Sequence, residues 1–208
     1  MNSKLYLISP PEIINPTIFK DLLDKILSYP FVNFFQLRIK NETDENIINL
    51  IKTIKPICDK NKKPLILNDR PDLAASIKCA GVHIGPDDMS YEEARTMVGK
   101  NALVGFSCKG SKEIATEMTK KGANYVAFGA FYDSPTKKVK IKVNPEIIRA
   151  WKASENSPCV AIGGIKITNC APIIEAGADF LAISSGIWQF SKGPLAAIEH
   201  FGEKLLAK

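Results

Sequence analysis

The chain alternates short apolar segments with longer segments of helical periodicity, and the alternation recurs eight times. Short apolar runs bounded by polar or turn residues are typical of buried parallel strands. We expect strands at residues 5–8, 34–38, 64–67, 81–84, 103–107, 125–128, 159–162 and 180–183. The pattern predicts helices at residues 16–28, 44–61, 71–80, 90–98, 111–121, 144–153, 167–176 and 194–206.

Eight strand–helix repeats predict an α/β fold, a single-domain (β/α)8 TIM barrel over residues 1–208. The alternative is an open doubly wound sheet, which usually has fewer strands and often a glycine-rich fingerprint after the first. Here the first predicted strand is followed by Ser9-Pro10-Pro11. Local signals agree with the helix boundaries: Asp44 and Ser90 fit N-cap positions, and Ala-Gly or Gly-Ala pairs at 80–81, 122–123 and 176–178 predict left-handed helix ends.

Composition narrows the classes of partner. No apolar run reaches membrane-spanning length and the first residues lead directly into a strand, so we expect a cytoplasmic protein. Five widely spaced cysteines without a CxxC pair predict reduced thiols. The net charge of +6 comes without an arginine-rich or aromatic-interleaved stripe, so phosphorylated small molecules are better partners than nucleic acid. The sequence leaves a monomer and a homo-oligomer equally open.

Polar residues at the carboxyl ends of barrel strands are candidates for chemistry. Gln36, Arg38 and Lys40 are spaced two apart, so they point to one side of an extended strand. Asp69 and Asp88 follow two neighbouring strands, and hard carboxylate oxygens without nearby His or Cys suit Mg²⁺. The structural alternatives are a salt-bridge layer inside the barrel and, for Asp88, a helix cap. An anion bridged by a metal is the favoured interpretation.

Two further stretches predict anion contacts. Residues 132–144 form a long lysine-rich loop, which suggests a lid over an anion, with Lys137 as its main candidate. Gly163-Gly164 and Ser184-Ser185 follow the last two strands, where barrels usually bind phosphate through backbone N–H groups. His83 lies within a strand, and we expect a core histidine held by one hydrogen bond, outside the site.

Seven motifs together resemble the thiamine phosphate synthase (thiamine-phosphate pyrophosphorylase) family, over essentially the whole chain. They are QLRIK at 36–40, NDRPDLA at 68–74, GVHIGPDDM at 81–89, GFS at 105–107, SPTKK at 134–138, AIGGI at 161–165 and ISSGI at 183–187. The family joins 4-amino-2-methyl-5-hydroxymethylpyrimidine diphosphate to a thiazole phosphate, giving thiamine phosphate and pyrophosphate. Pro86 departs from the family, which commonly has Gln there.

The resemblance implies a role for each matching residue. The pyrimidine diphosphate would be bound by Gln36, Leu37, Arg38, Ile39, Lys40, Asn68, Ser107 and Lys137, of which Arg38, Lys40, Ser107 and Lys137 would be catalytic. The thiazole phosphate would be bound by Ser134, Pro135, Thr136, Gly164, Ser184 and Ser185, and Mg²⁺ by Asp69 and Asp88. The alternatives are a thiazole tautomerase relative on the same barrel and a non-catalytic barrel that senses thiazole phosphate or thiamine phosphate.

Overall fold

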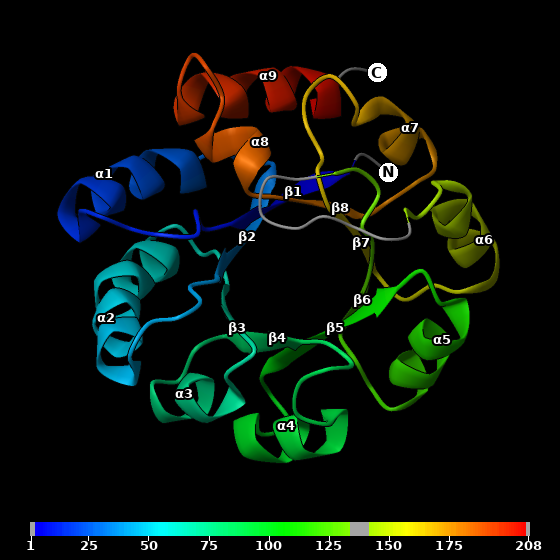
Figure 1. Cartoon of the computed structure of the whole chain (residues 1–208), viewed down its shortest axis with the longest axis horizontal. Helices are drawn as coiled ribbons and strands as arrows, with labels where there is room; N and C mark the ends of the chain where they lie inside the picture. Colours follow the sequence, from blue (N-terminus) through cyan, green and yellow to red (C-terminus); the bar gives the residue numbers. More distant parts are fainter. Residues whose placement is uncertain (1–2, 134–141, 207–208) are drawn as a thin grey trace.

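The computed structural model describes residues 3–133 and 142–206, which form a closed barrel of parallel strands inside a ring of helices (Figure 1). Each strand pairs with the next in the chain, and β8 pairs with β1 to close the barrel. The strands are β1 (Lys4–Ile8), β2 (Val32–Leu37), β3 (Leu65–Asn68), β4 (Gly81–Ile84), β5 (Leu103–Lys109), β6 (Tyr125–Phe128), β7 (Cys159–Ile162) and β8 (Phe180–Ile183). The predicted TIM barrel is confirmed.

Helices follow the strands around the outside of the barrel (Figure 1). They are α1 (Pro16–Leu27), α2 (Asp44–Lys60), α3 (Pro71–Ser76), α4 (Tyr91–Val98), α5 (Lys112–Lys120), α6 (Glu146–Ser154), α7 (Ala171–Glu175), α8 (Ser185–Trp188) and α9 (Pro194–Leu206). The short helix α8 has no counterpart among the predicted helices. No helix in these described ranges is long and apolar enough to cross a lipid bilayer.

Two predicted helix boundaries were wrong: the seventh helix begins at Ala171 instead of residue 167, and the third helix ends early. The third helix ends at Ser76, and Lys78 takes the left-handed conformation with φ 54° that was predicted near Ala80-Gly81. Gly81 begins β4, as predicted, and a side chain there would overlap the backbone of Leu103 on the adjacent strand. Glycine is therefore required there for the close approach of two strands.

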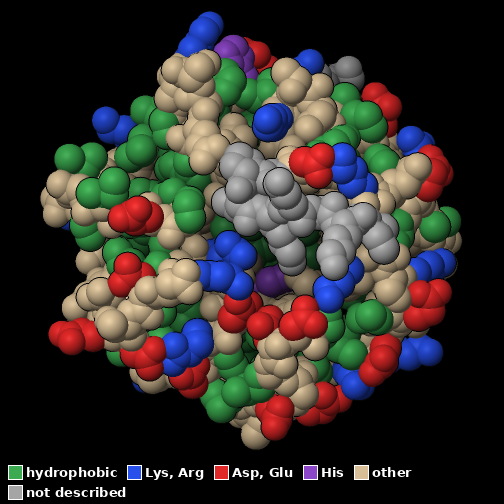
Figure 2. Space-filling model, in the orientation of Figure 1, with side chains coloured by type: hydrophobic (Ala, Val, Ile, Leu, Met, Phe, Trp, Pro, Cys, Tyr) green, Lys and Arg blue, Asp and Glu red, His purple; other side chains and the backbone are tan. Residues whose placement is uncertain are grey.

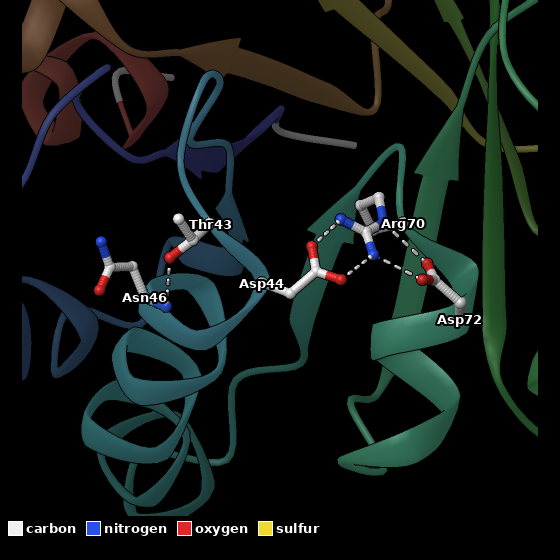
Figure 3. Close-up of polar contacts among 5 residues, drawn as sticks. All are labelled: Thr43, Asp44, Asn46, Arg70 and Asp72. Carbon is white, nitrogen blue, oxygen red and sulfur yellow. Dashed lines mark hydrogen bonds and ion pairs between the residues drawn. The ribbon is translucent and has the colours of Figure 1, made fainter.

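The helix starts show which capping signals were correct. Ser90 caps α4 in a capping box with Glu93, as its spacing predicts. Asp44 is not the N-cap of α2: Thr43 precedes it and accepts a hydrogen bond from the backbone N–H of Asn46 at 3.3 Å (Figure 3). Asp44 occupies the first helical position, where its negative charge still suits the positive end of the helix dipole.

The strands bury side chains on both faces, so the core has two layers. The outer layer lies between the strands and the helices and contains most of the large apolar residues. The inner layer fills the barrel and includes Tyr6, Ile66, Tyr125 and Val160. All five cysteines are free and buried. The charged inward-facing residues lie at the carboxyl ends of the strands, where the candidate site lies.

Candidate active site

A cavity of about 350 Å³ opens at the carboxyl ends of the strands. Acidic and basic side chains border the hollow at the centre of Figure 2, and a histidine is visible inside it; His83 is the histidine that lines the cavity. Most of the predicted site residues line it as well: Gln36, Arg38, Lys40, Asn68, Asp69, Asp88, Ser107, Gly164, Ser184 and Ser185. The structure therefore brings together groups from β2, β3, β4, β5, β7 and β8.

Strand β2 supplies the basic side of the cavity. Ser9 braces the backbone of Arg38, because its hydroxyl accepts from the Arg38 N–H at 3.0 Å and donates to the Arg38 carbonyl at 3.3 Å. Lys40 reaches across to Asp69, with Nζ 3.4 Å from Oδ2. Arg38 makes no ion pair with any residue of the described ranges, so its guanidinium is available to an anion. Among the described residues, Arg38, Lys40, Asp69 and Asp88 form one ion pair with one another, Lys40–Asp69, so the salt-bridge layer considered from the sequence is reduced to that pair.

The five consecutive residues assigned to the pyrimidine diphosphate differ in where their side chains lie. Gln36, Arg38 and Lys40 line the cavity, as the two-residue spacing predicts. Leu37 is 1% exposed and packs in the layer between the sheet and the helices, and Ile39 packs against the same layer. Leu37 and Ile39 can therefore offer a ligand in the cavity only their backbone.

The two candidate metal ligands, Asp69 and Asp88, lie in the loops that follow β3 and β4. Asp69 has the left-handed φ of 62°, and its N–H donates to the carbonyl of His83 at 2.9 Å. Asp88 accepts from the N–H of Gly85 at 2.8 Å. Burial raises the pKa of Asp88, and the neighbouring Asp69 carboxyl raises it further. Asp69 is half-buried and Asp88 is exposed, and the Asp69 carboxyl disfavours the charge on Asp88; a cation between them would relieve this repulsion.

Arg70 braces the loops that carry these groups. Its guanidinium donates to both oxygens of Asp44, at 2.6 and 2.9 Å, and to both oxygens of Asp72, at 2.9 and 2.6 Å (Figure 3). Asp44 begins α2 and Asp72 lies in the first turn of α3, so the bidentate contacts tie the two helix starts together. The basic loop after β2 and the acidic residue Asp69 are thereby held in a defined relation.

The opposite side of the cavity is built mainly from backbone. Gly163 and Gly164 have φ of 106° and 66°, and a side chain at 164 would overlap the carbonyls of residues 132 and 133. Asn169 supports this turn by donating to the Gly164 carbonyl at 3.1 Å. Ser184 donates to the carbonyl of Ser9 at 2.8 Å, and α8 begins at Ser185. The glycine turn and the Ser-Ser turn thus both line the cavity after neighbouring strands, and phosphate binding there stays a prediction.

His83, which was predicted to lie outside the site, lies at the floor of the cavity. His83 is 6% exposed and makes two hydrogen bonds instead of one, from Nδ1 to the Tyr125 hydroxyl at 3.0 Å and from Nε2 to the Ser107 hydroxyl at 2.8 Å. Burial lowers its pKa to about 4, so it is neutral at pH 7. The signal that could have placed it was the alternation in Val82-His83-Ile84, since both apolar neighbours face the helices.

Part of the predicted site lies outside the described residues: Ser134, Pro135, Thr136 and Lys137 of the lysine-rich loop. At the described edges of that loop, Lys142 pairs with Asp133 at 2.6 Å.

The chain is similar in sequence to known proteins of one family. The sequence model described as "Thiamine monophosphate synthase" matches residues 5–187. The thiamine-phosphate synthase of Rhodospirillum centenum is 43% identical over 198 residues, covering 95% of both chains. That of Pelagibacter ubique is 41% identical over 195 residues, covering 93% of both.

A solved structure extends the likeness to three dimensions. The thiamine phosphate pyrophosphorylase of Pyrococcus furiosus superposes with a TM-score of 0.83 at 27% identity, covering 98% of this chain and 97% of that one. The family match spans most of the chain, and the curated relatives bear the name of a transferase. The chain therefore belongs to the thiamine monophosphate synthase family, a family of transferase enzymes.

Proposed function

We propose that this protein is a thiamine phosphate synthase that couples 4-amino-2-methyl-5-hydroxymethylpyrimidine diphosphate with a thiazole phosphate, releasing pyrophosphate. The observation that carries the proposal is the meeting of two differently built anion sites in one cavity. One combines Arg38 and Lys40 with the carboxylates of Asp69 and Asp88. The other is the backbone turn at Gly163 and Gly164 beside β8. Two such sites suit two phosphorylated substrates.

Asp69 and Asp88 fit a divalent cation. They offer only oxygen, their carboxyls are close enough for one to raise the pKa of the other, and a diphosphate bound at Arg38 would lie beside them. No cluster of three or more His, Cys, Asp or Glu that could hold a metal occurs in residues 3–133 and 142–206. Two carboxylates completed by substrate phosphates and water are the usual Mg²⁺ arrangement. When bound, Mg²⁺ would supply positive charge to the diphosphate leaving group.

The reaction we propose begins with loss of the diphosphate. The bond between the methylene carbon and the diphosphate oxygen breaks, and its electron pair leaves with the diphosphate. The 4-amino group donates electron density through the pyrimidine ring and stabilises the methylene cation. Arg38 and Lys40 stabilise the charge that develops on the leaving group, and we assign the same role to Lys137, which lies outside the described residues.

The second step forms the new carbon–nitrogen bond. The thiazole nitrogen gives its lone pair to the methylene cation, and that nitrogen carries no proton to remove. A general base is therefore not needed. The state of His83 supports this view, because burial keeps the ring neutral and both of its nitrogens are already hydrogen-bonded.

The proposal is tested by the metal dependence of the coupling rate. Both precursors and Mg²⁺ are mixed with the wild-type protein, Asp69→Asn, Asp88→Asn and Asp59→Asn, and thiamine phosphate is followed with and without EDTA. Asp59 is an exposed carboxylate near the end of α2, paired with Lys55, and serves as the matched control. We expect EDTA and both site variants to lower the rate at least about a hundredfold, as loss of a charge-stabilising group does.

The opposite result would be informative as well. Equal rates in all four proteins would contradict the metal site. Absence of product with bound thiazole phosphate would instead favour the tautomerase relative or the non-catalytic sensor.

A further inference from the structure

A continuous chain of buried polar groups crosses the barrel beneath the cavity. The Gln36 amide nitrogen lies 3.0 Å from the Tyr6 hydroxyl, and the Tyr6 and Tyr125 hydroxyls are 2.7 Å apart. Tyr125 continues to His83 Nδ1 at 3.0 Å, and His83 Nε2 reaches the Ser107 hydroxyl at 2.8 Å. The two ends, Gln36 and Ser107, line the cavity. The three central residues have no role in the mechanism above.

The backbone is arranged to make room for this chain. In the strand register His83 pairs with Gly105, and Gly105 pairs with Tyr125. The His83 and Tyr125 rings lie nearly parallel, 15° apart with centroids 5.6 Å apart, across the strand that bears the glycine. A side chain at 105 would overlap the Tyr125 ring. Gly105 therefore lets side chains from β4 and β6 meet across β5.

The hydrogen bonds have a single consistent direction once the Gln36 amide nitrogen points at Tyr6. An amide nitrogen can only donate, so Tyr6 accepts there. The Tyr6 hydrogen then has one acceptor among the described residues, Tyr125, because a buried hydroxyl hydrogen left without a partner is costly. Tyr125 in turn donates to Nδ1 of His83.

The direction at the far end follows from the hydrogen bond that His83 accepts at Nδ1. A neutral imidazole that accepts at Nδ1 carries its proton on Nε2, so His83 donates to the Ser107 oxygen. The Ser107 hydrogen is then left for the cavity, and so is the Gln36 carbonyl oxygen.

We propose that Tyr6, Tyr125 and His83 are positioning residues that fix the polarity of the two cavity-facing groups, making Gln36 an acceptor and Ser107 a donor. Resting on the proposed function, this polarity selects a pyrimidine with an exocyclic amino group, whose N–H is accepted by Gln36. Ser107 donates to an acceptor on the same substrate. A 4-oxo pyrimidine presents an oxygen to the Gln36 oxygen and is rejected. Reversing the Gln36 amide would reverse every bond in the chain and the preference with it.

The direction of the hydrogen bonds is tested by finding which ring nitrogen of His83 carries the proton. The ¹⁵N chemical shifts of His83 are measured at neutral pH in the substrate-free wild-type protein and assigned against His83→Gln. We expect a pyrrole-like shift for Nε2 and a pyridine-like shift for Nδ1. A protonated Nδ1 in the wild-type protein would overturn the proposal. Because this measurement needs no turnover, a protein that fails to couple the substrates yet shows the Nε2–H form refutes the proposed function alone.

The consequence for recognition is tested by binding. Calorimetry gives the affinities of the 4-amino pyrimidine diphosphate and its 4-oxo analogue for the wild-type protein, Tyr125→Phe, Tyr6→Phe and Tyr91→Phe. Tyr91 is the matched control: it is a buried tyrosine outside this chain of hydrogen bonds, and its hydroxyl accepts from Arg95 Nε at 3.2 Å. We expect the preference for the amino compound to fall about tenfold in Tyr125→Phe and Tyr6→Phe, because the Gln36 amide becomes free to reverse. An unchanged preference in both would overturn the proposal.

Discussion

The buried His83 makes the stability of the fold depend on pH in a defined window. Its pKa falls from 6.5 to about 4 on folding because the ring is removed from water inside the barrel. The unfolded chain therefore takes up a proton below pH 6.5, whereas the folded protein resists it until about pH 4. The contribution of neutral His83 to the unfolding free energy is therefore fully present above pH 6.5 and is lost as the pH falls from 6.5 towards 4.

The size of the loss follows from the two pKa values. Each pH unit between them costs about 1.4 kcal/mol, so moving from about pH 7.5 to about pH 5 removes about 2 kcal/mol of unfolding free energy. Asp88 acts in the opposite direction, because its raised pKa lets the folded state take up a proton more readily. Paired carboxylates such as Asp44, whose pKa is lowered by Arg70, lose their contribution at lower pH. The contribution of His83 is therefore isolated by comparison with a variant.

The assay is urea denaturation of the wild-type protein, His83→Gln and His200→Gln at both pH values, in buffer with EDTA. His200 is a half-exposed histidine on α9 beside Glu203, so its removal is expected to leave the loss in place. His83→Gln is expected to lower stability at pH 7.5 but to lose about 2 kcal/mol less than the wild type on acidification. Parallel losses in the wild type and His83→Gln would refute the reasoning.

Three further substitutions give independent predictions. Gly81→Ala is expected to cost about 1–3 kcal/mol in urea denaturation, because the added methyl overlaps the backbone of Leu103; an unaltered midpoint would contradict the close strand approach. Ser90→Ala removes the hydroxyl that accepts from the Glu93 backbone N–H, leaves the bond from the Ser90 backbone N–H to the Glu93 carboxylate, and should cost about 1 kcal/mol by the same measurement; a cost near zero would contradict the role of the cap. Lys137→Ala should lower kcat more than it raises KM in the coupling assay, and an unchanged kcat would remove Lys137 from the mechanism.

The barrel could be predicted because its local signals are strong and repeated. Short apolar runs with turn residues at both ends gave β4, β6, β7 and β8 their observed bounds. Helix ends were harder to predict. Position 81 was read as a helix end because glycine favours left-handed caps, but the approach of a neighbouring strand decided its role. Such an approach depends on residues distant in the sequence.

In the site, likewise, some placements follow from local sequence and others depend on residues far along the chain. The two-residue spacing of Gln36, Arg38 and Lys40 is a local property of a strand, and their shared cavity face followed from it. The partners of His83 did not follow, because Tyr125 and Ser107 reach it from strands far along the chain. Gly105 contributes by lacking a side chain, and a sequence does not reveal which ring fills such a space.

The central claim is that one cavity joins two phosphorylated substrates. The most direct measurement is the stoichiometry of thiamine phosphate and pyrophosphate formed from the pyrimidine diphosphate and the thiazole phosphate in the presence of Mg²⁺. The account predicts equal amounts of the two products, with neither formed when the thiazole phosphate and the metal are withheld. Pyrophosphate without thiamine phosphate in the complete mixture, or no product at all, would contradict it.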